Sequence, residues 1–280
     1  MTDIIRQILE LLSYPFAIRA ILVGGAVSLC AALLGVSLVL KRYSMIGDGL
    51  SHVGFAILAV SGALGAAGAS LTIAIPVVVL CAIILLRITE NSPIGGDAAI
   101  AVLSTLSLAI GYIVMYKAGT NVDVSSYMFG NIFTIRTDEM YFSLAAAGVV
   151  IVLFLLFYHK IFAITFDENF AGAVGVPAGL YNIIIASLTA VTIVLGMRMM
   201  GTLLISALII FPALTSMRLF KSFRAVIISS AIVSVFCFLT GVVSAHILTV
   251  PAGSAVVVTN GIVFVLFSIA GNIKEKIASK

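Results

Sequence analysis

Asp48 and His52 stand four residues apart in an apolar segment, residues 46–54. On a helix this spacing places both side chains on one face. A carboxylate oxygen with an imidazole nitrogen suits Zn²⁺, Mn²⁺ or Fe²⁺, whereas Ca²⁺ and Mg²⁺ prefer oxygen ligands alone. Two ligands are too few for a tight site, but two copies of the chain paired about a two-fold axis would supply four. The pattern therefore predicts a metal-binding pair on a route through the molecule.

A simpler interpretation of the same pair also fits the sequence. Asp48 follows Lys41 and Arg42 closely, so it could act as the N-cap of the second apolar helix. His52 would then donate a hydrogen bond to a neighbouring helix. The two interpretations differ in whether Asp48 lies at the helix boundary or inside the helix.

Three further residues stand where a pathway or gate could lie: Asp97, Pro212 and His246. Asp97 follows Pro93 and Gly96, so a capping role is favoured, with a pathway role as the alternative. Pro212 interrupts an apolar run, and proline in a membrane helix frees backbone carbonyls and bends the helix. His246 is a single histidine near the end of its run, which favours packing at the membrane interface.

The sequence carries no P-loop, no nucleophile elbow and no HExxH motif. We expect no enzymatic activity and no permanently bound cofactor. The cysteines at 30, 81 and 237 lie in separate apolar runs without CxxC spacing, which predicts buried small side chains and no thiolate site.

The composition assigns the chain to a membrane, because 62% of its residues are hydrophobic and 9% are charged. A soluble domain carries roughly a quarter charged residues. Basic residues are scattered between apolar runs, which excludes a nucleic-acid-binding stripe. Runs near the ~20 residues needed to span hydrocarbon predict an all-α bundle of about nine transmembrane helices, with eight or ten as alternatives: 20–40, 49–69, 71–86, 98–116, 140–158, 180–197, 199–217, 225–248 and 253–271. Because only Arg198 and its neighbours separate the sixth run from the seventh, one broken or re-entrant segment is an alternative there.

The distribution of Lys and Arg predicts the orientation. With nine spans and the C-terminus inside, ten of the 15 basic residues lie in the cytoplasm and five lie outside. We therefore expect the N-terminus outside and the C-terminus in the cytoplasm. Residues 1–17 alternate polar and apolar residues, which predicts an interfacial amphipathic segment. Residues 18–272 form the predicted transmembrane domain, and residues 273–280 a cytoplasmic tail.

The inner connection at residues 159–179 has the signals of a short helix. Asp167 can cap it, Gly175 can end it and Pro177 prevents its return. We expect Phe166 and Phe170 on one face of this helix, as a docking element for a cytoplasmic partner. An interfacial helix without a partner is the alternative.

Five segments in order resemble the permease subunits of ABC importers for zinc, manganese and iron. Residues 40–52 are similar to that family's basic pair followed by G-D-x-x-[SA]-H, and residues 166–175 to its F-D-x-x-x-A-x-x-x-G coupling loop. The other three are similar to its acidic inner segment, its outer-loop stretch and its V-G-x-L-L-V-x-A-L-L-x-x-P-A segment: residues 96–100, Asp123 with 127–131, and 201–213.

The resemblance implies a homodimeric permease in a prokaryotic plasma membrane, with a fold like that of vitamin B12-type importers. It implies two cytoplasmic ATPases that dock on Phe166, Asp167, Phe170, Ala171 and Gly175. It also implies an extracellular substrate-binding protein that delivers the metal. The Gly49-Leu50 and Gly54-Phe55 pairs depart from the choices of many manganese members, which favours zinc, then manganese, then iron.

Two rival functions remain open from the sequence. An ion-coupled secondary transporter would use Asp48 and His52 for a coupling ion, but it would need no docking helix for a motor. A siderophore or cobalamin permease shares the architecture, but it would not be expected to place a carboxylate and an imidazole together in its pathway.

Overall fold

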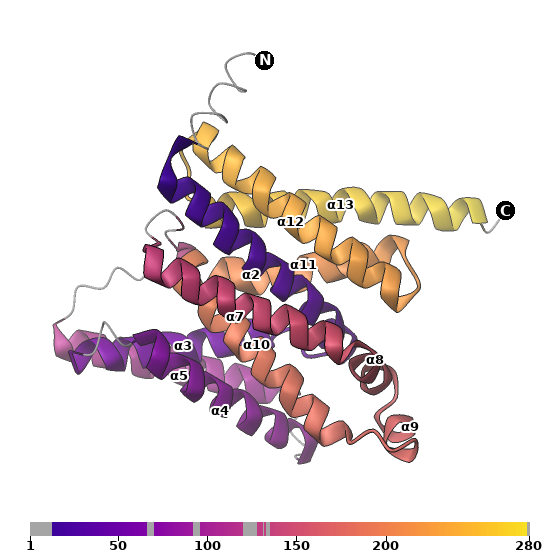
Figure 1. Ribbon diagram of the computed structural model, residues 1–280, viewed down its shortest axis with the longest axis horizontal. Helices are drawn as coiled ribbons and strands as arrows, with labels where there is room; N and C mark the ends of the chain where they lie inside the picture. The colour runs from indigo at the N-terminus through magenta and orange to yellow at the C-terminus, as the bar shows by residue number, and fades with distance from the viewer. Residues whose placement is uncertain are drawn as a thin grey trace.

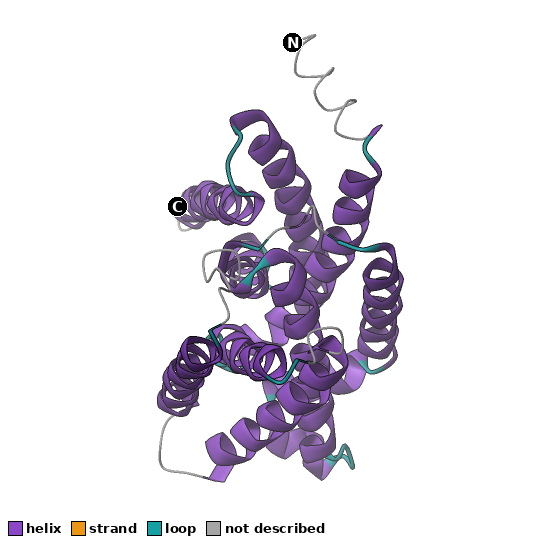
Figure 2. Ribbon diagram, turned by 90° about the vertical axis from the view of Figure 1, so that its left-hand side faces the viewer, coloured by secondary structure: helices purple, strands orange, loops and turns teal. Residues whose placement is uncertain are grey.

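The computed structural model describes residues 13–65, 70–91, 96–119, 128–130, 132 and 135–278. Within this part of the chain the regular elements are all α-helices joined by short connections (Figure 2). In order they are α2 (Pro15–Leu40), α3 (Ile46–Ala63), α4 (Ser70–Asn91), α5 (Gly96–Ala118), α7 (Thr137–Leu156), α8 (Tyr158–Phe166), α9 (Glu168–Ala173), α10 (Ala178–Met200), α11 (Thr202–Leu219), α12 (Phe223–Leu248) and α13 (Ala252–Ala278).

Eight of the described helices are long and apolar enough to cross a membrane, and α4 adds a shorter apolar stretch, Ile73–Ile88. Each of the nine predicted runs corresponds to one of these helices, so the helix-bundle prediction is confirmed. The predicted N-terminal segment lies mostly outside the described residues, and α2 begins at Pro15. The last helix, α13, continues without a break through the predicted tail to Ala278.

The core of the bundle is built around α2 and α10. In both helices 72% of the apolar span is buried, against 17% in α5 and 22% in α7 and α13. Helix α2 packs against α7, α10, α11 and α12, while α3, α4 and α5 form a second group joined to it through α10 and α11 (Figure 1). Because α5, α7 and α13 bury so little, these helices present apolar faces outwards to lipid or to another chain.

The sixth and seventh spans are separate helices that meet at Gly201. The helix α10 continues through Arg198 to Met200, so the break predicted at Arg198 lies three residues later. Gly201 has φ +89°, and a Cβ there would lie 2.4 Å from the carbonyl oxygen of Met128 and 2.5 Å from the amide nitrogen of Gly130. Only glycine fits this turn, because other residues are strained at positive φ and lack the space.

Candidate metal pathway and docking helix

The third residue of α3 is Asp48, so its carboxylate lies inside the first helical turn. The N-cap is Met45, whose side chain makes no capping hydrogen bond. The capping interpretation of Asp48 is therefore wrong, because the helix begins three residues earlier than that role requires. A carboxylate in the first turn still interacts favourably with the positive end of the helix dipole.

The side chains of Asp48 and His52 face one another, as the four-residue spacing predicts. His52 Nε2 lies 3.6 Å from Asp48 Oδ2, with the side chains 16% and 42% exposed respectively. This distance is too long for a hydrogen bond. The other imidazole nitrogen, Nδ1 of His52, is buried without a hydrogen-bond partner among the described residues. Two ligand atoms each ~2.1 Å from a tetrahedral ion lie about 3.4 Å apart, so this separation suits two ligands of one ion.

The first turn of α3 packs closely against the middle of α11. A Cβ on Gly47 would lie 3.1 Å from Ile209 Cδ1 and 3.6 Å from Ser206 Cα. Ser206 and Ile209 both lie within α11 and away from its ends. On α2, a Cβ on Gly35 would lie 2.1 Å from the carbonyl oxygen of Ile209. Small residues thus let α2, α3 and α11 approach closely, and the pair lies beside the body of a spanning helix.

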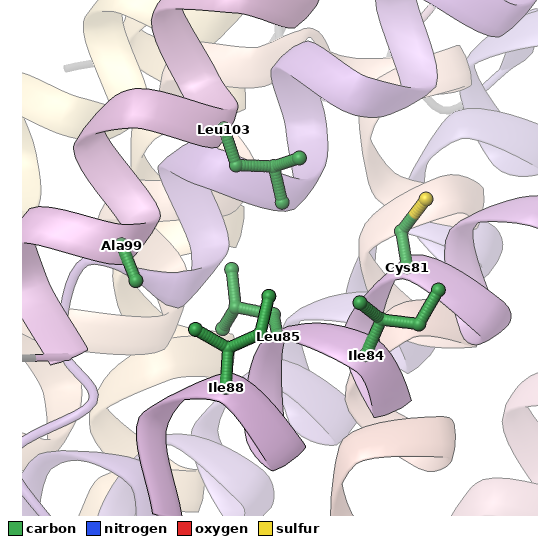
Figure 3. Close-up of a pocket in the computed structure, with 6 residues that line it drawn as sticks. All are labelled: Cys81, Ile84, Leu85, Ile88, Ala99 and Leu103. Atoms are coloured by element: carbon green, nitrogen blue, oxygen red, sulfur yellow. The ribbon is translucent and has the colours of Figure 1, made fainter. Parts of the chain in front are cut away.

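Asp48 and His52 of one chain would supply only part of a metal site. Within the described residues no group of three or more His, Cys, Asp and Glu could hold a metal ion. An apolar hollow between α4 and α5 does not add ligands. Its volume is ≈ 190 Å³, and Figure 3 shows one Cys81 thiol among the aliphatic side chains that line it.

The three predicted gate residues lie on different helices. Asp97 is the second residue of α5, and its side chain lies outside the description. Pro212 is buried within α11. His246 is half-buried in the last turn of α12, which packs on α2, α11 and α13, whereas α3 packs on α4, α5, α10 and α11. The structure gives no common site for these residues.

The docking segment is two short helices at one end of the bundle, with α8 leading directly into α9 (Figure 1). Asp167 caps α9, since its side chain accepts a hydrogen bond from the Phe170 amide at 2.9 Å. Gly175 has φ +84°, and Pro177 is the N-cap of α10. These local predictions are confirmed.

The placing of Phe166 and Phe170 on one helix is wrong, because Phe166 ends α8 and Phe170 lies within α9. Asp167 interrupts the helix between them with an extended backbone. Both rings are nevertheless more than half exposed, at 60% and 63%. Ala171, the next residue of α9, is fully buried and anchors the helix to the bundle.

A polar cluster that sequence reasoning missed joins α9 to the bundle. Lys41 Nζ lies 2.5 Å from Glu168 Oε1 and 2.5 Å from Asn182 Oδ1, and Asn182 Nδ2 donates to Glu168 Oε1 at 3.2 Å. Burial acts to raise the pKa of the Glu168 carboxyl, but the Lys41 ammonium and the Asn182 amide outweigh it and hold that pKa below its ordinary value. The only sequence signal for this cluster was Lys41, the basic residue that follows the first apolar span.

The long apolar helices, with the Asp48–His52 pair between them and the short helices α8 and α9 at one end, form the architecture of a polytopic membrane protein. Residues 13–271 match the family described as "ABC 3 transport family", and the chain belongs to this family. The permease prediction made from the sequence is therefore confirmed.

Similar proteins span nearly the whole chain. It is 28% identical to "Manganese import system permease protein ScaB" of Streptococcus gordonii, over 90% of each chain. It is 30% identical to a "Probable iron transport system membrane protein" of Haemophilus influenzae, over 92% of this chain and 91% of that one. Among solved structures, "PsaBC from Streptococcus pneumoniae in complex with Fab" matches with TM-score 0.83 and 29% identity, covering 94% of this chain and 95% of that one.

Proposed function

We propose that this chain is the permease subunit of an ATP-driven importer that carries a divalent transition-metal ion across the plasma membrane. The observation that carries the proposal is the Asp48–His52 pair, with two ligand atoms 3.6 Å apart on one helix face. An ionisable pair in an apolar span is costly, at roughly 2.5–3.5 kcal/mol for a central carboxylate on insertion scales. Such residues mark ion pathways by default.

The chemistry of the pair selects the class of metal. One oxygen and one nitrogen ligand suit Zn²⁺, Mn²⁺ and Fe²⁺ in preference to Mg²⁺ or Ca²⁺. The names of the relatives favour manganese or iron, whereas the sequence argument favoured zinc through Gly49 and its neighbours. Gly49 has a packing reason of its own, because a Cβ there would lie 2.6 Å from Ile100 Cγ2. We therefore propose manganese as the first cargo to test and zinc as the second.

The working unit of the proposal is a homodimer. One chain offers two ligands, and the 42% exposed Asp48 side chain has room to meet a second copy. Four ligands from two copies would bind the ion weakly and reversibly. An importer needs such weak binding because it must release the ion again. The little-buried helices α5 and α13 offer apolar surface for such a pairing.

The remaining partners complete the proposed cycle. Two cytoplasmic ATPase subunits would dock on Phe170 and the rest of α9, and an extracellular binding protein would deliver the ion. The N-terminus would lie outside and the C-terminus in the cytoplasm, as the ten-to-five division of basic residues favours.

The test is metal uptake into vesicles that contain the complex with its co-purifying ATPase. Asp48→Asn keeps the side-chain shape but removes the carboxylate ligand, and His52→Ala removes the imidazole. Both variants should assemble, continue to hydrolyse ATP and lose Mn²⁺ and Zn²⁺ uptake. The matched control is Asp138→Asn, on an exposed carboxylate, which should transport normally. Uptake by Asp48→Asn at the wild-type rate would refute this metal site, and uptake driven by a proton gradient without ATPase would refute the ABC assignment.

A further inference from the structure

The Lys41–Glu168–Asn182 cluster connects three elements that are distant in the sequence. Lys41 follows the last residue of α2, Glu168 is the first residue of α9, and Asn182 lies in the second turn of α10. The Lys41 side chain is 9% exposed and Asn182 is 5% exposed. A lysine this buried must be paired, and here its ammonium has both partners within hydrogen-bonding distance. The Glu168 side chain is 46% exposed, so the cluster is a junction that ties a buried lysine and a buried amide to a carboxylate at the protein surface.

On one side of this junction the chain leads to the metal pair through a closely hydrogen-bonded corner. The Tyr43 amide donates to the Leu38 carbonyl at 2.8 Å and the Arg42 amide to the Val39 carbonyl at 3.1 Å. With Arg42 at φ +64°, this is a Schellman motif formed without glycine.

The corner continues into α3 without a flexible linker. The Ile46 amide donates to the Tyr43 carbonyl at 3.1 Å, and the Gly49 amide donates to the Met45 carbonyl at 3.1 Å. Within the eight residues from Lys41 to Asp48, backbone hydrogen bonds thus link the end of α2 to Tyr43, and Tyr43 to the first residue of α3. Because these hydrogen bonds join Lys41 to the start of α3, we expect a displacement of Lys41 to reach that helix.

On the other side, the junction holds the docking helix. Glu168 is two residues from the exposed Phe170 ring, and Asp167 fixes the start of the same helix by capping it. Since α9 has only six residues, every residue on its exposed face lies within two helical turns of Glu168.

We propose that the Lys41–Glu168–Asn182 junction couples movement of the docking helix α9 to the Asp48–His52 pair, which makes Lys41 and Glu168 positioning residues for transport. This inference rests on the proposed function, since it assumes an ATPase on α9 and a metal at the pair. In this role the junction converts movement of the ATPase into a change in the affinity of the Asp48–His52 pair for the metal.

The first experiment measures metal ions moved per ATP hydrolysed, with Mn²⁺ as the probe, in vesicles that contain the complete complex. Glu168→Gln and Lys41→Met should retain the co-purifying ATPase and should continue to hydrolyse ATP. The ratio of Mn²⁺ moved to ATP hydrolysed should fall at least about fivefold, the lower end of typical coupling effects. The matched control is Glu275→Gln, which removes the carboxylate of an exposed ion pair with Lys221 at 3.7 Å and should leave the ratio unchanged.

The second experiment is a double-mutant cycle on the same ratio. The variant that carries both changes should lose no more than either single variant, because one change already opens the junction. Losses that multiply in the double variant would overturn the inference, as would a wild-type ratio in Glu168→Gln. Loss of the ATPase from Glu168→Gln would also overturn it, because Glu168 would then be a docking contact. Absence of ATP-driven uptake by the wild-type complex would refute the proposed function itself, before any variant is compared.

Discussion

The contact of Gly35 with the backbone of α11 allows a quantitative test of the packing that seats the metal pair. In Gly35→Ala the new Cβ would lie 2.1 Å from the carbonyl oxygen of Ile209. An ordinary C···O contact is about 3.3 Å, so α2 and α11 must separate by about 1.2 Å or distort. Neither atom belongs to a flexible side chain that could rotate away. Gly25→Ala on the same helix is the matched control, because its Cβ would meet nothing within 4 Å.

Comparing the two variants isolates the cost of this contact. Both gain the same ~0.8–1 kcal/mol of helix propensity from glycine to alanine, so this gain cancels. Overpacking a core costs about 1–3 kcal/mol, and 2 kcal/mol lowers the melting temperature by about 4–8 °C in a chain of 150–250 residues. We expect Gly35→Ala to melt lower than Gly25→Ala by about this amount.

The assay follows from the composition of the chain. It contains no tryptophan, but Cys30 and Cys237 are buried. A thiol-reactive fluorogenic dye therefore reports unfolding of the purified protein in detergent. Because Ile209 also packs on Gly47, next to Asp48, Gly35→Ala should also reduce metal uptake. Equal melting temperatures for the two variants would refute this account of the α2–α11 contact.

Three other predictions use the remaining features. Phe170→Asp, on a ring that is 63% exposed, should release the ATPase without unfolding the bundle, and normal co-purification would show that α9 is not the docking element. Cysteines introduced near Lys274 should resist labelling from outside while those at residues 121–138 react, and external labelling near Lys274 would reverse the orientation. Because the pKa of Glu168 is held below its ordinary value, the junction is formed above about pH 4.3 and is lost only as pH falls through the depressed pKa. The difference in Mn²⁺ per ATP between wild type and Glu168→Gln should therefore stay constant from pH 8 down to about 5, and a decline within that range would contradict the ion pair.

The sequence predicted features whose signals lie within a few neighbouring residues. Long apolar runs predicted the helices because a span must satisfy its own backbone hydrogen bonds. The cap by Asp167 and the positive φ of Gly175 were predictable because each depends on residue type and local position.

Features that depend on distant parts of the chain were not predictable. Lys41 and Glu168 are 127 residues apart, and no local pattern pairs them. The position of Asp48 beside the interior of α11 depends on how Gly35 and Gly47 accommodate Ile209. The exact break at Gly201 depends on the backbone of residues 128–130, which approaches it from the connection between α5 and α7. One prediction failed locally, because Asp167 separates Phe166 from Phe170 by starting a new helix.

The one-residue junction at Gly201 has a consequence for how the chain enters the membrane during synthesis. Helices α10 and α11 are joined by this residue alone, so they must insert as a single hairpin. Arg198 travels near the tip of that hairpin, and a basic residue crossing hydrocarbon is costly. Its partner Glu139, 3.1 Å away, lies at the start of α7, which is synthesised first. We therefore expect the carboxylate to be in place before the arginine arrives, so that the order of translation lowers the cost of completing the fold.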